Sequence, residues 1–126
     1  MSDDGVYQTN PEPGVLERLR EASWNRQKAW HPADSEPWTV ADWTLAMCGE
    51  AGEAANFAKK LRRIETGVRN DGDPEMDVLI ESYIKELADV VIYADLCASY
   101  YGFDLAEVVR RKFNATSEKF GFEERI

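Results

Sequence analysis

Residues 47–57, MCGEAGEAANF, show the pattern of an amphipathic helix that carries two acids on its apolar side. Because a helix turns about 100° per residue, side chains within about 40° of one direction form a stripe. This stripe consists of Trp43, Ala46, Glu50, Ala54, Phe57 and Leu61. Glu50 lies at its centre, and Glu53 lies one turn further on, slightly to the side. An ordinary amphipathic helix carries Leu or Ile there, so the two carboxylates indicate a positively charged partner.

Length and composition are typical of one soluble globular domain. The chain has 126 residues, of which 44% are hydrophobic and 31% charged. No apolar run approaches the ~20 residues of a membrane span, and the first ten residues lack the basic and apolar parts of a signal peptide. Cys48 and Cys97 fall in helical patterns, where we expect small buried residues in a reducing compartment. These features predict a cytoplasmic protein with no membrane partner.

The formal net charge of −9 narrows the range of partners. Duplex nucleic acid is not expected to bind, because a basic protein face supplies most of the affinity for it. A small phosphorylated ligand remains compatible with this charge, since divalent metals bridge acidic protein groups to phosphates.

The order of apolar and turn-forming residues predicts an all-α, four-helix bundle. We expect a loose N-terminal arm over 1–13, one helical domain over 14–120, and a frayed tail over 121–126. The expected helices run from about 15 to 30, from 40 to 63, from 76 to 101, and from 105 to 119.

Capping residues support three of these helix ends. Thr39 with Asp42 has the spacing of a capping box at the start of the second helix, and Asp104 begins the fourth in a similar way. Gly102 is suited to ending the third helix. That third helix is apolar nearly all round, which indicates a central position in the domain or contact with a partner subunit.

A second acidic pair lies on the third helix, at Glu86 and Asp89. Carboxylates three residues apart share one face of a helix, and antiparallel packing of the second and third helices brings both pairs together. Four half-buried carboxylates repel each other and are costly to desolvate. A hard divalent cation with oxygen ligands removes that cost.

The type of metal follows from the available ligands. Diiron bundles use Glu-x-x-His pairs, and zinc prefers Cys and His. The only histidine is His31, in a proline-rich loop, where we expect a surface position. An all-oxygen Mg²⁺ or Mn²⁺ site remains, and such sites polarise phosphates and activate water.

Three segments resemble those of the MazG-like, all-α nucleoside triphosphate pyrophosphohydrolases, a superfamily that includes dimeric dUTPases and dCTP pyrophosphatases. They are GEAGE (49–53), KELADVVIY (85–93) and KFN (112–114). The family signature is E-x-x-E on one helix and E-x-x-D on the next. The residues that match it are Glu50, Glu53, Glu86 and Asp89. The resemblance covers roughly residues 15–120.

This resemblance implies a bundle that assembles as a homodimer or homotetramer. It implies hydrolysis of a (deoxy)nucleoside triphosphate to the monophosphate and pyrophosphate, as in house-cleaning of the nucleotide pool. The four acids would then be both catalytic residues and ligands of Mg²⁺, with Mn²⁺ as a substitute.

Further residues are candidates for substrate binding, each with an ordinary structural alternative. Tyr93 matches an aromatic residue of the nucleotide pocket in dCTP-type relatives, or is a core tyrosine. Lys112 matches a lysine that is common in the family and is a candidate to contact the triphosphate. Its alternative role is to stabilise the C-terminal end of its helix by interacting with the helix dipole. Asn114 fits the K-x-N form of that segment. Lys60, in a basic cluster, steers an anionic substrate or is solvated. Trp38 stacks on a base, or packs in the core.

Some positions depart from the dCTP-specific relatives, which leaves the base and sugar open. Those relatives carry Trp at the position of Lys60, His at that of Trp38, and Asn at that of Asp42. The single E-x-x-E also fits dimeric dUTPases less well than a doubled motif does. Two other functions stay open: a non-catalytic helical module that binds a nucleotide or a protein, and a structural oligomer with solvated acids.

Overall fold

The computed structural model describes residues 13–126, and this part of the chain contains four α-helices and no strand. Their bounds are α1 Val15–Trp30, α2 Val40–Glu65, α3 Met76–Tyr100 and α4 Leu105–Phe120. The expected all-α, four-helix fold is confirmed, with small shifts at the helix ends. The expected N-terminal arm falls almost entirely on residues 1–12, which lie outside the described residues.

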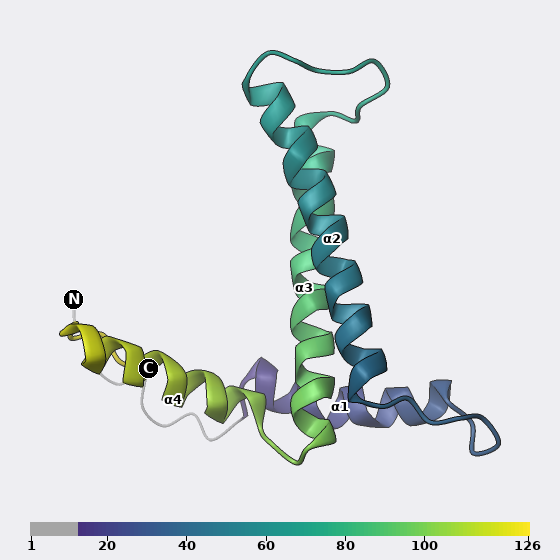
Figure 1. Cartoon of the computed structure of the whole chain (residues 1–126), viewed down its shortest axis with the longest axis vertical. Helices are drawn as coiled ribbons and strands as arrows, with labels where there is room; N and C mark the ends of the chain where they lie inside the picture. The colour runs from purple at the N-terminus through teal and green to yellow at the C-terminus, as the bar shows by residue number, and fades with distance from the viewer. Residues whose placement is uncertain (1–12) are drawn as a thin grey trace.

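The helices form an open bundle built around a long hairpin (Figure 1). Helices α2 and α3 pack side by side and antiparallel, joined by the loop 66–75. They have 26 and 25 residues, which corresponds to about 39 and 37 Å of helix. Helix α1 crosses the foot of this hairpin, and α4 runs away from it to one side. No helix of residues 13–126 therefore covers the half of the hairpin nearer its loop.

The expected capping residues act at three helix ends. The Thr39 backbone N–H donates to the Asp42 carboxylate at 2.8 Å, so this first turn begins where the sequence indicates. The Asp104 carboxylate accepts from the backbone N–H of Ala106 at 3.0 Å. Gly102 has a φ of 79°, and its N–H donates to the Ser99 carbonyl at 2.9 Å, which ends α3.

The C-terminal tail differs from the expected frayed segment. Gly121 takes a φ of 77°, and the Phe122 N–H donates back to the Ser117 carbonyl at 2.8 Å. The side-chain amide of Asn114 then accepts from the Ile126 N–H at 2.9 Å and donates to its carbonyl at 3.0 Å. The tail therefore folds back along α4, because one amide satisfies both backbone groups of its last residue.

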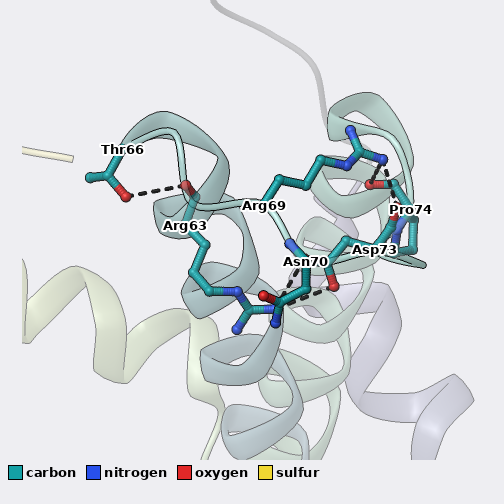
Figure 2. Close-up of polar contacts among 6 residues, drawn as sticks. All are labelled: Arg63, Thr66, Arg69, Asn70, Asp73 and Pro74. Carbon is teal, nitrogen blue, oxygen red and sulfur yellow. Dashed lines mark hydrogen bonds and ion pairs between the residues drawn. The ribbon is translucent and has the colours of Figure 1, made fainter.

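The loop at the tip of the hairpin is held by arginine contacts (Figure 2). The Arg63 guanidinium donates to both carboxylate oxygens of Asp73, at 3.1 and 3.2 Å. Arg69 donates to the backbone carbonyls of Asp73 and Pro74, at 2.6 and 3.2 Å. The loop therefore connects the helices through an ion pair in which one guanidinium nitrogen of Arg63 contacts both carboxylate oxygens of Asp73.

The chain buries little apolar surface by itself. Among residues 13–126 the buried apolar side chains are Trp43, Ala54, Leu79 and Leu96. Many large apolar side chains of α3 and α4 stay exposed, including Ile84 and Phe113. The part of the chain that the structure describes holds no helix with the length and apolar character of a bilayer crossing.

The two cysteines are free thiols, and only one lies where we expected it. Cys97 is half-buried, with its sulfur 3.6 Å from the Thr44 hydroxyl across the hairpin. Cys48 is exposed, so the expectation of two buried cysteines is wrong for this residue. Its helical position lies away from α3, and none of the other described helices covers it.

Replacing Asp73 with Asn should lower the melting temperature at pH 7, on the order of a few °C. The bond from Arg63 holds the pKa of the Asp73 carboxyl below its usual value. Because this pKa is lower in the folded than in the unfolded protein, the ionised carboxylate stabilises the fold at pH values above the unfolded-state pKa. That stabilisation is lost as the pH falls through the folded-state pKa.

Thermal unfolding of both proteins from pH 7 down to pH 2 measures this effect. The difference between wild type and Asp73→Asn should shrink to nothing at the acid end. Asp71→Asn, in the same loop and exposed, is the control and should leave the melting temperature unchanged. An equal loss in both variants would contradict a specific role for the pair.

Candidate functional site

Three of the four predicted metal ligands meet between α2 and α3. Glu50 on α2 and Glu86 and Asp89 on α3 each offer a carboxylate oxygen, and these oxygens all lie within 4.8 Å of one another. All three residues are half-buried. The i, i+3 spacing on α3 and the antiparallel packing of the hairpin produce this cluster, as the sequence predicts.

The electrostatics of the cluster resemble those of a cation site. The pKa of the Glu50 carboxyl is raised above its ordinary value, chiefly because it shares a hydrogen bond with Glu86. Partial burial and the negative charges of Glu86 and Asp89 add to this effect. An oxygen-preferring divalent ion fits this set of carboxylate donors.

Glu53 is the predicted ligand that the structure leaves outside the cluster. It lies one turn beyond Glu50, exposed to solvent, and is not among the three acids whose oxygens converge. Its charge still contributes to the raised pKa of Glu50. Glu53 thus lies at the edge of the site, where it can supply a ligand only after its side chain moves inward.

Aromatic rings gather next to the acids, at the foot of the hairpin. The Trp38 ring lies 4.6 Å from that of Trp43, between centroids, and 5.0 Å from the His31 ring. Trp43 stacks on Tyr93 of α3 at 6.1 Å and an interplanar angle of 29°. Trp43 is buried, whereas Trp38 is 40% exposed and therefore presents part of its ring to solvent.

These rings and two of the acids line one pocket of about 460 Å³. A pocket of this size is within the range that holds a drug-sized ligand. The lining residues come from α1, the loop before α2, α2 and α3: Ser23, Arg26, Gln27, Trp30, His31, Trp38, Trp43, Glu50, Asp89, Ile92, Tyr93 and Leu96. The acid cluster therefore opens onto a mostly aromatic and aliphatic cavity.

Helix α1 adds residues to this pocket that the sequence pattern did not single out. Arg26 is the basic residue of the lining, and Ser23 and Gln27 add polar groups. His31, expected at the surface, is half-buried and packs on the two tryptophans. No local motif marks these residues, because they reach the acids only when α1 crosses the foot of the hairpin.

Three predicted substrate-binding residues lie elsewhere and do not line the pocket. Lys60 is about 15 Å further along α2 from Glu50, with its ammonium 5.8 Å from the Phe57 ring centroid. Lys112 is exposed on α4. Asn114 uses its amide to hold Ile126. Within a single chain, the structure brings Trp38 and Tyr93, but none of these three, to the acids.

The arrangement combines a charged end and a flat apolar part in one cavity. The acids can bind a hard divalent cation, and through it an anion such as a phosphate chain. The partly exposed Trp38 offers a π-face for a planar ring, and Tyr93 lines the same pocket. No model of a known protein family matches the chain, and no curated protein matches it either.

Replacing Glu50 with Gln should change the melting temperature in different ways without and with Mg²⁺. Without metal the melting temperature should rise, because one of three mutually repelling carboxylates is removed. Mg²⁺ should raise the melting temperature of the wild type, because a ligand that binds only the folded protein stabilises it. Glu50→Gln removes one ligand of the ion, so this increase should be lost in the variant.

Differential scanning fluorimetry in EDTA and in a Mg²⁺ series measures both effects. Glu118→Gln, an exposed acid on α4, is the control and should change neither value. A wild-type protein whose melting temperature ignores both Mg²⁺ and Mn²⁺ would contradict a cation site.

Proposed function

We propose that this protein is a Mg²⁺-dependent nucleoside triphosphate pyrophosphohydrolase. The observation that carries this proposal is that Glu50 and Asp89 belong both to the acid cluster and to the lining of the aromatic pocket. A nucleotide has the matching chemistry, with a polyphosphate chain at one end and a planar base at the other. The resemblance to the MazG-like enzymes points to the same reaction.

The reaction adds water across one phosphoanhydride bond. A nucleoside triphosphate and water give a nucleoside monophosphate, pyrophosphate and a proton. Mg²⁺ held by Glu50, Glu86 and Asp89, with Mn²⁺ as a substitute, would neutralise phosphate charge and activate the attacking water. Glu53 is then the fourth acid, recruited from the edge of the site as its side chain turns inward.

The chain's own residues position the substrate. Trp38 and Tyr93 provide faces for the base, and Arg26 supplies a positive charge in the same pocket. The hydrogen bond with Glu86 is the chief cause of the raised pKa of Glu50, and the charges of Glu86, Asp89 and Glu53, whose repulsion a bound cation would relieve, also contribute to it. Catalysis by positioning and electrostatics suits phosphoryl chemistry, because the leaving group needs charge neutralisation rather than covalent help.

Several finer features belong to this proposal. We place the reaction in the cytoplasm, as part of the control of the nucleotide pool, and assign the working form to a homodimer or homotetramer. Lys60, Lys112 and Asn114 lie away from the pocket of their own chain, so any contact with a substrate would need a second chain or a movement of α4.

Pyrophosphate release from a panel of ribo- and deoxyribonucleoside triphosphates, with Mg²⁺ and with EDTA, tests the proposal. We expect metal-dependent release from one nucleotide or a few. Glu50→Gln and Asp89→Asn should each lower kcat/KM by about 100-fold or more, because each removes charge stabilisation at the reacting phosphates.

Glu118→Gln is again the control and should retain full activity. Binding of a nucleotide without pyrophosphate release would favour the non-catalytic module instead. If neither binding nor turnover occurs while Mg²⁺ still raises the melting temperature, the cation site stands and the nucleotide proposal fails.

The aromatic pocket makes a separate prediction about KM. Trp38→Ala should raise KM by about tenfold with a small change in kcat, since stacking a base on an aromatic side chain contributes about 1–3 kcal/mol. Steady-state kinetics with the preferred nucleotide measure both constants. Tyr101→Ala, at an exposed aromatic residue outside the pocket, should leave both constants unchanged.

A further inference from the structure

One hydroxyl group in the aromatic pocket has no hydrogen-bond partner. Ser23, on α1, lines the pocket and is only 3% exposed. Among residues 13–126 its Oγ atom is buried and finds neither a donor nor an acceptor. Buried polar groups in folded proteins are almost always paired, so this hydroxyl calls for a physical explanation.

The position of Ser23 in a helix does not supply that explanation. A serine inside a helix can donate to the backbone carbonyl four residues before it, which here belongs to Leu19. The Ser23 hydroxyl makes no such bond. An alanine at this position would favour the helix and would avoid the cost of burying an unpaired hydroxyl. A partner that enters the pocket from outside accounts for the serine, whereas the fold of α1 does not.

Ser23 lies at the end of the pocket away from the acids. The α3 residues of the lining extend from Asp89 to Leu96, a distance of about 10 Å along the helix axis. Helix α3 runs from the hairpin loop toward the foot, so Leu96 is near the foot, where α1 crosses (Figure 1). Because Ser23 belongs to α1, it lines the pocket at this end.

This end of the pocket is enclosed and carries neutral polar groups. Ser23 and Leu96 are 3% and 4% exposed. Gln27, one turn after Ser23 on the same side of α1, is half-buried and adds a side-chain amide to the lining. Arg26 is exposed, and its guanidinium lies 5.3 Å from the ring centroid of Trp30, which is 70% exposed. The positive charge of α1 therefore lies toward solvent rather than at the enclosed end.

The two ends of the pocket fit the two ends of a nucleotide. The acid cluster, through a divalent cation, suits the phosphate chain. The sugar and the base then extend along the pocket toward α1. The edge of the base opposite the sugar carries an amino or oxo group, at C4 of a pyrimidine or at C6 of a purine. This exocyclic group is the part of the base that reaches the enclosed end.

We propose, on the basis of the nucleotide activity proposed above, that the Ser23 hydroxyl hydrogen-bonds to this exocyclic group and thereby selects the base. A hydroxyl can accept from an amino group or donate to an oxo group. Trp38 then lies against the face of the base, and Ser23 contacts its edge. A base without the exocyclic group leaves the buried hydroxyl unpaired, and a site with such an unpaired group binds poorly.

The phosphate chain is a less suitable partner for Ser23. Phosphate oxygens are charged, and burying a charge without an opposite charge is far more costly than burying a neutral polar group. At the enclosed end such a chain would meet the hydroxyl of Ser23 and the amide of Gln27, both of which are neutral. The cation that would neutralise the chain belongs with the acids, at the other end.

The test compares two substrates in two proteins. One substrate is the triphosphate that the wild type hydrolyses best, and the other is the same nucleotide without the exocyclic group. The second base is 2-pyrimidinone for a pyrimidine, and purine or 2-aminopurine for a purine. In the wild type, kcat/KM should be about 10- to 100-fold lower for the second substrate. In Ser23→Ala this ratio should fall to about twofold or less, because the hydroxyl that the second base leaves unpaired is gone.

Ser99→Ala is the matched control. Ser99, on α3, also has a buried Oγ atom without a partner among residues 13–126. It lines a different cavity, together with Arg20 and Trp24 of α1. The same change of side chain at this position should leave the wild-type ratio intact. Both variants should fold, since alanine favours a helix more than serine does.

Binding provides a second readout that needs no turnover. Triphosphate analogues with a methylene group between the α- and β-phosphorus atoms cannot lose pyrophosphate. Trp30, Trp38 and Trp43 line the pocket, so tryptophan fluorescence should report the dissociation constant. The ratio of the two dissociation constants should follow the same pattern as kcat/KM in the wild type and in Ser23→Ala.

Two outcomes would overturn this assignment of Ser23 while leaving the proposed function intact. A wild type that accepts both bases equally excludes a contact with the exocyclic group. A Ser23→Ala variant that keeps the wild-type ratio limits Ser23 to a structural role or to a contact with water. A protein that binds no nucleotide at all would remove the pyrophosphohydrolase proposal and this one together.

Discussion

The packing of α2 against α3 is the interaction on which the rest of the structure depends. It stacks Trp43 on Tyr93, brings Thr44 to Cys97, and places Glu50 within reach of Glu86 and Asp89. The loop pair between Arg63 and Asp73 closes the far end of the same hairpin. Because both helices are long and antiparallel, one register determines both the acid cluster and one wall of the pocket.

That register places the carboxylates of Glu50, Glu86 and Asp89 together. Their mutual repulsion destabilises the fold unless another interaction compensates for it. The pKa of Glu50 is raised chiefly by its hydrogen bond with Glu86, and the neighbouring negative charges add to this effect. Sites that bind cations or catalyse reactions commonly keep such a conflict, because the ligand or substrate relieves it. Glu50 and Asp89 line the aromatic pocket and are half-buried, so their charges are screened less by water than they would be at an open surface.

The two sides of the hairpin are covered differently. On one side, α1 and the acids line the aromatic pocket. Large apolar side chains of α3 such as Ile84, which does not line that pocket, stay exposed among residues 13–126.

Much of the fold follows from local signals in the sequence. The spacing of apolar residues and the caps at Thr39, Gly102 and Asp104 determine where helices begin and end, since these effects act within a few residues. The i, i+3 acids on α2 and α3 also indicate a shared cation site before any contact is known. The sequence does not predict that Asn114 holds the tail, because no periodic pattern of residues marks its contact with Ile126.

The composition of the pocket depended on tertiary structure. Arg26, His31 and Trp38 reach the acids only because α1 and the following loop cross the foot of the hairpin. The position of Glu53 outside the cluster likewise depends on how its side chain turns, rather than on its spacing. The sequence by itself determined the four helices and the two acidic pairs, because periodicity and capping act locally. Only the tertiary structure decided which side chains surround those acids, because crossing angles and register depend on packing between distant segments.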